Sequence, residues 1–170
     1  MQLHIKRLNK LMDNGNGEAY STLASFYFEG SFSLKQDYQK ARELYQKAGE
    51  LGCATAYYNL GISYGEGFGV EIDLRKANHY FELSAIGGHI KARHNLGCLE
   101  GKAGNYRRAM KHFMISARGG CKEALEGVKR GFMKEVVTKN EYANTLRAYH
   151  ERQKEMKSEE RDMASLLRIL

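Results

Sequence analysis

Two side chains with metal-binding chemistry lie four residues apart in a segment with helical periodicity. These are His94 and Cys98, and on a helix this spacing would place both on the same side, with His89 nearby. A closed zinc site needs about four ligands, and the sequence has no Cys-x-x-Cys pair or second ligand pair to complete one. Cys53, His89 and Cys121 occupy equivalent positions in successive repeated segments, so we expect them to lie a repeat apart and not around one ion. We therefore predict no metal site.

The glycine-rich segment GEGFG, residues 65–69, is the second pattern with possible chemistry, because glycine-rich loops can wrap phosphate groups. A P-loop follows a strand and continues into Lys and then Ser or Thr, whereas this segment follows a predicted helix and continues into Val-Glu-Ile. The sequence also offers few combinations of a nucleophile or acid–base pair with a third orienting group. We therefore predict a protein that is not an enzyme, with no catalytic residue and no cofactor.

The elements that would position these side chains are helices. The 170-residue chain has no proline and 18 glycines, and Ala, Leu, Lys, Glu and Arg fill most of the segments between the glycines. Its three cysteines are widely spaced, which is typical of free thiols in a reducing compartment, so we expect a cytoplasmic protein. No apolar run approaches the roughly 18 residues of a membrane span, and the first residues lack the pattern of a secretory signal.

An internal repeat organises the chain. The pattern Ala-x3-Leu followed by Ala or Gly begins at residues 19, 56 and 92, with periods of 37 and 36 residues. A second series of alanines, at residues 41, 77 and 109, has periods of 36 and 32. Both series have helical spacing, so each repeat is predicted to be a pair of helices, and the shortening in the third repeat marks the loop within the pair. Small residues of the first helix are expected to face aromatic residues of the second: Ala24, Gly61 and Gly97 against Tyr45, Phe81 and Phe113.

These patterns predict one repeat domain with an additional helix at each end. We expect an N-terminal capping helix in residues 1–16, repeats at 17–52, 53–88 and 89–120, and a degenerate fourth repeat at 121–157. In the fourth repeat, Thr138-x-x-Glu141 is a capping-box pattern that opens a long helix ending near Met156. Residues 158–170 are expected to form a short helix or tail. Its apolar residues, which could dock back or pair with a second copy of the chain, are Leu166, Leu167, Ile169 and Leu170.

Repeat two resembles the Sel1-like repeat, a relative of the tetratricopeptide repeat with a longer loop between its helices. The matching positions are Ala56, Leu60, Gly61, Tyr64, Gly67, Gly69, Val70, Asp73, Lys76, Ala77, Ala85 and Gly88. Repeat one keeps most of this pattern, while repeat three has Glu100 in place of the tyrosine and a shorter loop. The resemblance implies an all-α fold, a right-handed α–α superhelix of about three to four antiparallel helix pairs with capping helices at both ends. It also implies a non-enzymatic scaffold or adaptor that binds other proteins.

The resemblance further implies a binding groove, because in tetratricopeptide relatives the first helix of each pair lines a concave surface. The inward positions that carry over are Tyr58, Asn59, Ile62, Glu66, His94, Asn95, Cys98 and Arg130, together with Ser21, Ser25, Lys91 and Glu126. Tyr58 is the expected anchor, since an exposed tyrosine gives a large contact area at low entropy cost. Asn59 and Asn95 could hydrogen-bond the backbone of a ligand, or they could bond to neighbouring residues or face solvent.

The positive charge of the chain is concentrated in one segment. Residues 89–134 contain 11 Lys and Arg and 3 Asp and Glu, whereas the rest of the chain is nearly balanced. Part of this charge is expected on one basic face, formed by Arg107, Arg108, Lys111, Arg118 and Lys122. Such a face could bind an acidic polypeptide, RNA or an anionic membrane surface, or it could simply be solvated. We expect Tyr106 and Phe113 to lie in the core and so be unable to stack on bases, which favours a protein partner over RNA, the alternative.

Overall fold

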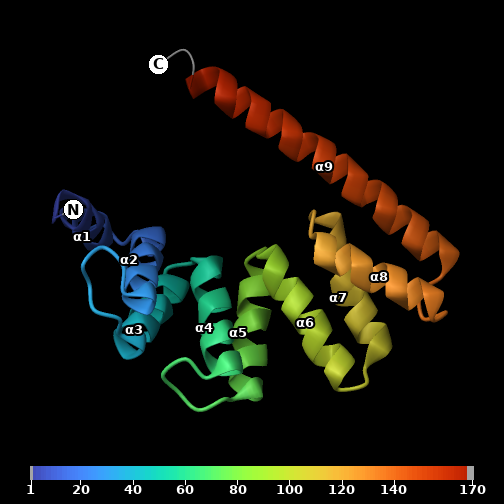
Figure 1. Cartoon of the computed structure of the whole chain (residues 1–170), viewed down its shortest axis with the longest axis horizontal. Coiled ribbons are helices and arrows are strands. Elements are labelled where there is room, and N and C mark those ends of the chain that lie inside the picture. The colour runs from blue at the N-terminus through green and yellow to red at the C-terminus, as the bar shows by residue number, and fades with distance from the viewer. Residues whose placement is uncertain (1, 168–170) are drawn as a thin grey trace. The chain divides into compact units, whose positions relative to one another are not determined.

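The computed structural model describes the backbone of residues 2–167 and the side chains of residues 5–164. Over this range every regular element is an α-helix and no strand is present, which confirms the predicted all-α fold class (Figure 1). The helices are α1 (Gln2–Asp13), α2 (Gly17–Glu29), α3 (Tyr38–Glu50), α4 (Ala54–Glu66), α5 (Leu74–Ile86), α6 (Ile90–Lys102), α7 (Tyr106–Arg118), α8 (Lys122–Met133) and α9 (Lys139–Leu167). The chain divides into two compact units, Met1–Ala92 and Arg93–Leu170.

Acidic caps and terminal glycines determine where several helices begin and end. Asp37 and Asp73 precede α3 and α5, and their side chains accept hydrogen bonds from the backbone N–H groups of Lys40 (2.9 Å) and Lys76 (3.0 Å). Gly67 ends α4 with a φ of 79°, a left-handed conformation that L side chains rarely adopt. The loop of repeat two therefore begins at the glycine that ends α4 and stops at the aspartate that caps α5.

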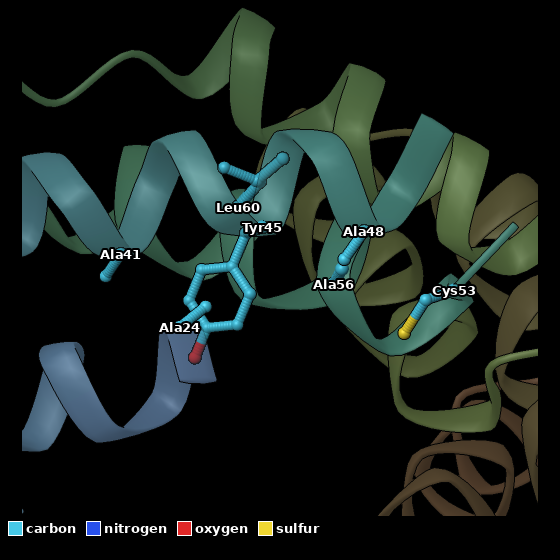
Figure 2. Packing of buried hydrophobic residues seen from close by; sticks show 7 residues of the cluster. All are labelled: Ala24, Ala41, Tyr45, Ala48, Cys53, Ala56 and Leu60. Carbon is cyan, nitrogen blue, oxygen red and sulfur yellow. The ribbon is translucent and has the colours of Figure 1, made fainter. Parts of the chain in front are cut away.

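Small residues packed against aromatic rings form the core of the first unit, as predicted. Ala24 and Tyr45 are buried in the cluster of Figure 2, which also contains Ala41, Ala48, Cys53, Ala56 and Leu60. In repeat two, a Cβ atom at Gly61 would lie 2.5 Å from Cε1 of Phe81, so the ring lies directly against the backbone of α4. The missing side chain at this position sets how closely α4 and α5 approach.

The glycine-rich loop of repeat two, residues 67–73, packs back on repeat one, and we call it the Phe68 loop. The ring of Phe68 lies 5.1 Å from the ring of Phe28 and 5.8 Å from that of Tyr38, measured between centroids. Arg42 donates a hydrogen bond to the carbonyl oxygen of Gly69 (3.0 Å). The loop therefore joins α4 to α5 and also links the two helix pairs of the first unit.

The second unit has the same kind of packing with different partners. A Cβ atom at Gly97 would lie 2.6 Å from Cε1 of Phe113, as the repeat predicts. Phe113 is buried in one cluster with Val128 of α8 and Val137 of the following loop. The segment expected as a degenerate fourth repeat contains the helices α8 and α9, and both pack against α7.

The start of α9 agrees with the sequence pattern. A carboxylate oxygen of Glu141 accepts a hydrogen bond from the backbone N–H of Thr138 (2.8 Å), and the backbone N–H of Glu141 donates to the Thr138 hydroxyl (3.2 Å). This reciprocal pair confirms the predicted capping box.

The end of α9 differs from the expectation. The separation of residues 158–170 as a short helix or tail is wrong, because α9 continues through residue 158 to Leu167. The segment from Met156 to Met163 contains no Gly or Pro and consists mostly of good helix formers, so no residue interrupts the helix. The apolar residues considered for self-association lie outside the residues whose side chains are described: Leu166, Leu167, Ile169 and Leu170.

Candidate partner-binding surfaces

A half-buried tyrosine lies on the face of α4 that was expected to line a groove. Tyr58 stacks on the imidazole of His89 with ring centroids 4.4 Å apart, and its ring lies 5.9 Å from that of Phe81. Ile62, one helical turn after Tyr58, is also half-buried, whereas Glu66, a further turn along, is exposed. We call the stripe formed by Tyr58, Ile62 and Glu66 the Tyr58 face. It combines an aromatic side chain stacked on a neighbouring ring with an aliphatic side chain and a carboxylate.

The polar residues beside the Tyr58 face bond within the first unit. The hydroxyl oxygens of Ser25 and Tyr45 are 3.0 Å apart, and the Ser25 hydroxyl donates to the carbonyl of Ser21 (3.1 Å). Because Ser25 uses its only proton on that carbonyl, Tyr45 donates to Ser25. Burial raises the pKa of Tyr45, so its hydroxyl stays neutral.

His89 supports Tyr58 and also caps α6. Its Nδ1 atom accepts a hydrogen bond from the backbone N–H of Ala92 (3.3 Å), at the position where Asn, Asp or Ser usually caps a helix. Burial lowers the pKa of His89, and the positive charge of Lys91 lowers it further. The neutral imidazole is therefore favoured, and it serves both as the cap and as the surface on which Tyr58 stacks.

In the second unit, the side chains expected in the groove contact one another. The ring of His94 lies 5.5 Å from that of Phe113, its Nδ1 lies 3.4 Å from Oδ1 of Asn95, and its Nε2 lies 3.8 Å from Sγ of Cys98. Burial raises the pKa of the Cys98 thiol, which favours its neutral form. Arg130 on α8 is exposed. His94 and Cys98 are neighbours as expected, but no third His, Cys, Asp or Glu among the described residues joins them in a possible metal-binding group.

Two residues of the expected basic face are paired with other groups. Arg107 lies 3.5 Å from a carboxylate oxygen of Glu141 and donates a hydrogen bond to the carbonyl of Val136 (2.6 Å). Arg108 forms an ion pair with Glu100 at 3.0 Å. Their positive charges are therefore partly balanced within the second unit.

The other three basic residues are exposed. Lys111, Arg118 and Lys122 form no ion pair within the part of the chain that the structure describes. At about 100° per residue, Arg107, Lys111 and Arg118 fall within one narrow stripe of α7, whereas Lys122 belongs to α8. The structure thus places a short basic stripe on α7 and does not bring all five residues into one environment.

The two aromatic residues near this stripe differ in exposure. Phe113 is buried, as expected, but the expectation that Tyr106 is in the core is wrong. Tyr106 is 60% exposed because it is the first residue of α7 and precedes the buried face, which begins at Ala109. With Arg107 and Arg108 it lines an open recess of about 790 Å³. A ring that could stack on a base is therefore available beside two guanidinium groups.

The contacts of two residues near the Tyr58 face, the buried Tyr45 and His89, were not predicted from the sequence. Tyr45 has phenylalanine at the equivalent positions of repeats two and three, so its hydroxyl was a signal that a polar partner lies nearby. His89 was considered only as a metal ligand, and no sequence spacing relates it to Tyr58, 31 residues earlier. Their contacts become visible only when neighbouring helix pairs are packed together.

Two general features of the chain agree with its composition. Cys53, Cys98 and Cys121 are free thiols, as predicted. Among the described residues, none of the helices combines the length and the apolar character that crossing a bilayer would require.

Comparison with known families gives three matches along the chain. The model of the Sel1 repeat matches residues 17–53, 54–89 and 90–121. These segments contain α2 to α7, arranged as three helix pairs.

Similar curated proteins are much longer than this chain. The chain is 33% identical over 85 residues to chitin synthase regulatory factor 2 of Schizosaccharomyces pombe, a match that covers 50% of this chain and 17% of that protein. It is 31% identical over 101 residues to the ERAD-associated E3 ubiquitin-protein ligase component HRD3B of Arabidopsis thaliana, covering 59% and 16% respectively. The matched segments therefore span about a sixth of each of these relatives.

Solved structures share the fold. A Sel1 repeat protein from Oxalobacter formigenes gives a TM-score of 0.73 at 24% identity, over 86% of this chain and 63% of that one. A protective antigen of uropathogenic Escherichia coli strains, which displays an SLR fold, gives a TM-score of 0.73 at 24% identity, over 89% and 33%. At this level of identity the likeness shows the fold alone.

Proposed function

Because this chain belongs to the Sel1 repeat family, we propose that it is a non-enzymatic adaptor whose first unit binds a partner polypeptide on the Tyr58 face. Sel1 repeat proteins generally mediate protein–protein interactions, and the family and its fold are typically those of non-enzymatic scaffolds. The observation that carries our choice of surface is the stack of Tyr58 on His89, with ring centroids 4.4 Å apart.

A tyrosine held in this way is suited to anchor a partner. Its ring already packs against His89 and Phe81, so we expect little side-chain entropy to be lost when a partner packs against it. Ile62 extends the apolar contact along α4, and Glu66 adds a charge at the edge of the face. Truncation of an anchor of this kind typically weakens binding by about 2 kcal/mol, or roughly thirtyfold in affinity.

The relatives support a role beside other proteins. One is a regulatory factor of a chitin synthase, and the other is a component of a ubiquitin-protein ligase. Both names describe proteins that act together with an enzyme. We extend this kind of role to the present chain, which would attach a partner to a larger assembly.

The basic stripe of the second unit is a separate candidate surface. Because Arg107 and Arg108 are paired with carboxylates, the cations most available to a partner are Lys111, Arg118 and Lys122. A few exposed cations favour contact with an acidic polypeptide, since tight binding of RNA usually neutralises many phosphates. The exposed ring of Tyr106 favours RNA instead, so RNA is included in the test.

The first experiment selects peptide ligands for the whole chain from a display library and then measures their affinities for variants. For Tyr58→Ala we expect a roughly thirtyfold loss of affinity. Tyr106→Ala is the matched control, because it removes an exposed tyrosine of the other unit, and we expect less than about a twofold change. If the two variants bind the selected peptides equally well, the Tyr58 face is not the binding surface.

A second arm tests the alternative. Labelled single-stranded RNA is titrated with the wild type and with the double variant Lys111→Glu and Arg118→Glu at two salt concentrations. One outcome would contradict our proposal: no peptide is selected, and the chain binds RNA with an affinity that falls steeply with salt and is lost in the double variant. The function would then be the binding of a polyanion.

A further inference from the structure

One side of α9 carries a row of cations that the composition of the helix does not reveal. α9 has as many acidic as basic residues, so its formal charges cancel. At about 100° per residue, however, five of its cations fall within an arc of about 80° around the helix axis, and this arc holds no carboxylate. We call the row the α9 stripe, and its members are Lys139, Arg147, Lys154, Lys157 and Arg161. Up to Arg161, the other residues in the arc are Ala143 and His150.

The α9 stripe faces away from the helices on which α9 packs. Thr145 and Met156 lie on roughly the opposite side of the helix. Thr145 is fully buried, and a Cβ atom at Gly120 would lie 3.3 Å from Sδ of Met156. All five members of the stripe are exposed. The second unit therefore leaves this side of α9 accessible along its described length.

The cations of the α9 stripe are not neutralised by neighbouring carboxylates. Arg152, outside the stripe, lies 3.2 Å from the carboxylate oxygens of both Glu155 and Glu159. No member of the stripe forms an ion pair with any residue of the described part of α9 or of the helices around it. Three members share one open hollow of about 500 Å³, which is lined by Lys154, Lys157, Glu160, Arg161 and Ala164. The positive charge of the stripe is thus available to an external anion.

The shape of the α9 stripe favours a flat partner. α9 is one unbroken helix (Figure 1), and Lys139 and Arg161 lie about 33 Å apart along its axis. Cations in a straight and narrow row can all touch a plane at the same time. A line along the convex side of a DNA duplex meets each strand only once per turn of about 34 Å, so a duplex offers the stripe few phosphates. The surface of an anionic bilayer presents charged headgroups in every direction.

The residues beside and between the cations also disfavour other polyanions. In the groove of a duplex, Glu151 and Glu155 beside the stripe would face phosphates and repel them. An acidic helix would find no apolar side chain larger than Ala143 in the arc, and exposed ion pairs alone contribute little to binding. An anionic bilayer needs no apolar contact, because its field acts on every cation within a Debye length of about 10 Å.

We propose that the α9 stripe binds the surface of an anionic membrane, with α9 parallel to the bilayer and its cations among the phosphate and carboxylate headgroups. The arc has no large apolar side chain to insert, so the contact is electrostatic and reversed by salt. This inference goes beyond the proposed function, because it would hold the chain at a membrane while the Tyr58 face binds a partner. Either can be wrong without the other.

The test measures co-sedimentation of the full chain with vesicles. We expect binding to vesicles of phosphatidylcholine mixed with phosphatidylserine, release at high salt, and no binding to phosphatidylcholine alone. Each cation near such a surface contributes roughly fivefold, so the double variant Lys154→Gln and Lys157→Gln should bind roughly twenty-fivefold more weakly. Glutamine is about as good a helix former as lysine, and far-UV circular dichroism checks that α9 is intact.

The matched control is the double variant Lys35→Gln and Lys47→Gln. Both lysines are exposed residues of the first unit, and their loss changes the net charge by the same amount. We expect less than about a threefold change, since they lie outside the stripe. Tyr58→Ala should bind vesicles as the wild type does, which separates this result from that of the peptide selection.

Three results would overturn the proposal. The first is the absence of binding to the phosphatidylserine vesicles, which the wild type alone can show. The second is equal binding by the two double variants, because the stripe would then have no particular role. The third is displacement of the chain from vesicles by duplex DNA or by polyglutamate at an equal concentration of charges, since that polyanion would then be the preferred partner.

Discussion

Replacement of Gly61 by alanine tests whether close approach of an aromatic ring to a helix backbone holds the repeat together. The new Cβ atom would lie 2.5 Å from Cε1 and 2.6 Å from Cδ1 of Phe81, a ring that is only 4% exposed. Overpacking of this kind costs about 1–3 kcal/mol, whereas the change from glycine to alanine inside a helix gains about 0.5–1 kcal/mol. We therefore expect Gly61→Ala to lower the free energy of unfolding by about 1–2 kcal/mol.

The same helix supplies a matched control. At Gly65 a new Cβ atom would meet only Cβ of Ala77, at an ordinary contact distance of 3.7 Å. Gly65→Ala should therefore raise the free energy of unfolding by about 0.5 kcal/mol through helix propensity alone. Urea titration followed by far-UV circular dichroism measures both variants against the wild type.

A double variant identifies the cause of the loss. With Phe81→Leu present, the smaller side chain leaves room at α4, so the additional loss caused by Gly61→Ala should shrink or vanish. A Gly61→Ala chain as stable as the Gly65→Ala chain, or a loss unchanged by Phe81→Leu, would refute the view that ring contact requires glycine at this position.

Three further predictions concern polar contacts. Tyr45→Phe leaves the Ser25 hydroxyl without its hydrogen-bond partner, so we expect a loss of about 1 kcal/mol in urea titration, and an unchanged midpoint would show that water replaces the Tyr45 hydroxyl. Thr138→Ala removes the capping box and should destabilise the chain by about 1 kcal/mol, with faster amide exchange in the first turn of α9 than elsewhere in that helix. The lowered pKa of His89 means that its contribution to stability is present above the ordinary value of 6.5 and is lost as pH falls through the lower folded value. Thermal midpoints measured from about pH 8 down to about pH 5 should therefore fall less in His89→Asn, which keeps a capping side chain without the titrating ring, and equal slopes would contradict this role.

The helix pairs could be predicted from the sequence because their signals are local or repeated. Recurrent small residues predicted the contacts of Gly61 and Gly97 with aromatic rings, since an anchor pattern repeated three times leaves few alternative registers. The capping box before α9 was likewise contained in four consecutive residues. The end of α9 was misplaced because Ser158 resembles a helix start, and nothing in the sequence says whether a preceding helix stops there.

The candidate surfaces were less predictable because they depend on contacts between distant segments. The stack of Tyr58 on His89 and the hydrogen bond from the Tyr80 hydroxyl to Gln46 join residues that are far apart in the sequence. Arg107 was counted as a free cation, but it bonds to the loop before α9, 29 residues away. Composition gives the number of such charges, and only the fold shows which of them are already neutralised.

The Phe68 loop has a consequence for how the chain unfolds. Its ring cluster and the bond from Arg42 to Gly69 join repeats one and two through contacts other than those between adjacent helices. In repeat proteins, cooperativity depends on the strength of coupling between neighbours relative to the stability of each repeat. Repeats one and two should therefore open together, as a single block of slowly exchanging amides, and Phe68→Ala should separate that block into two that open independently.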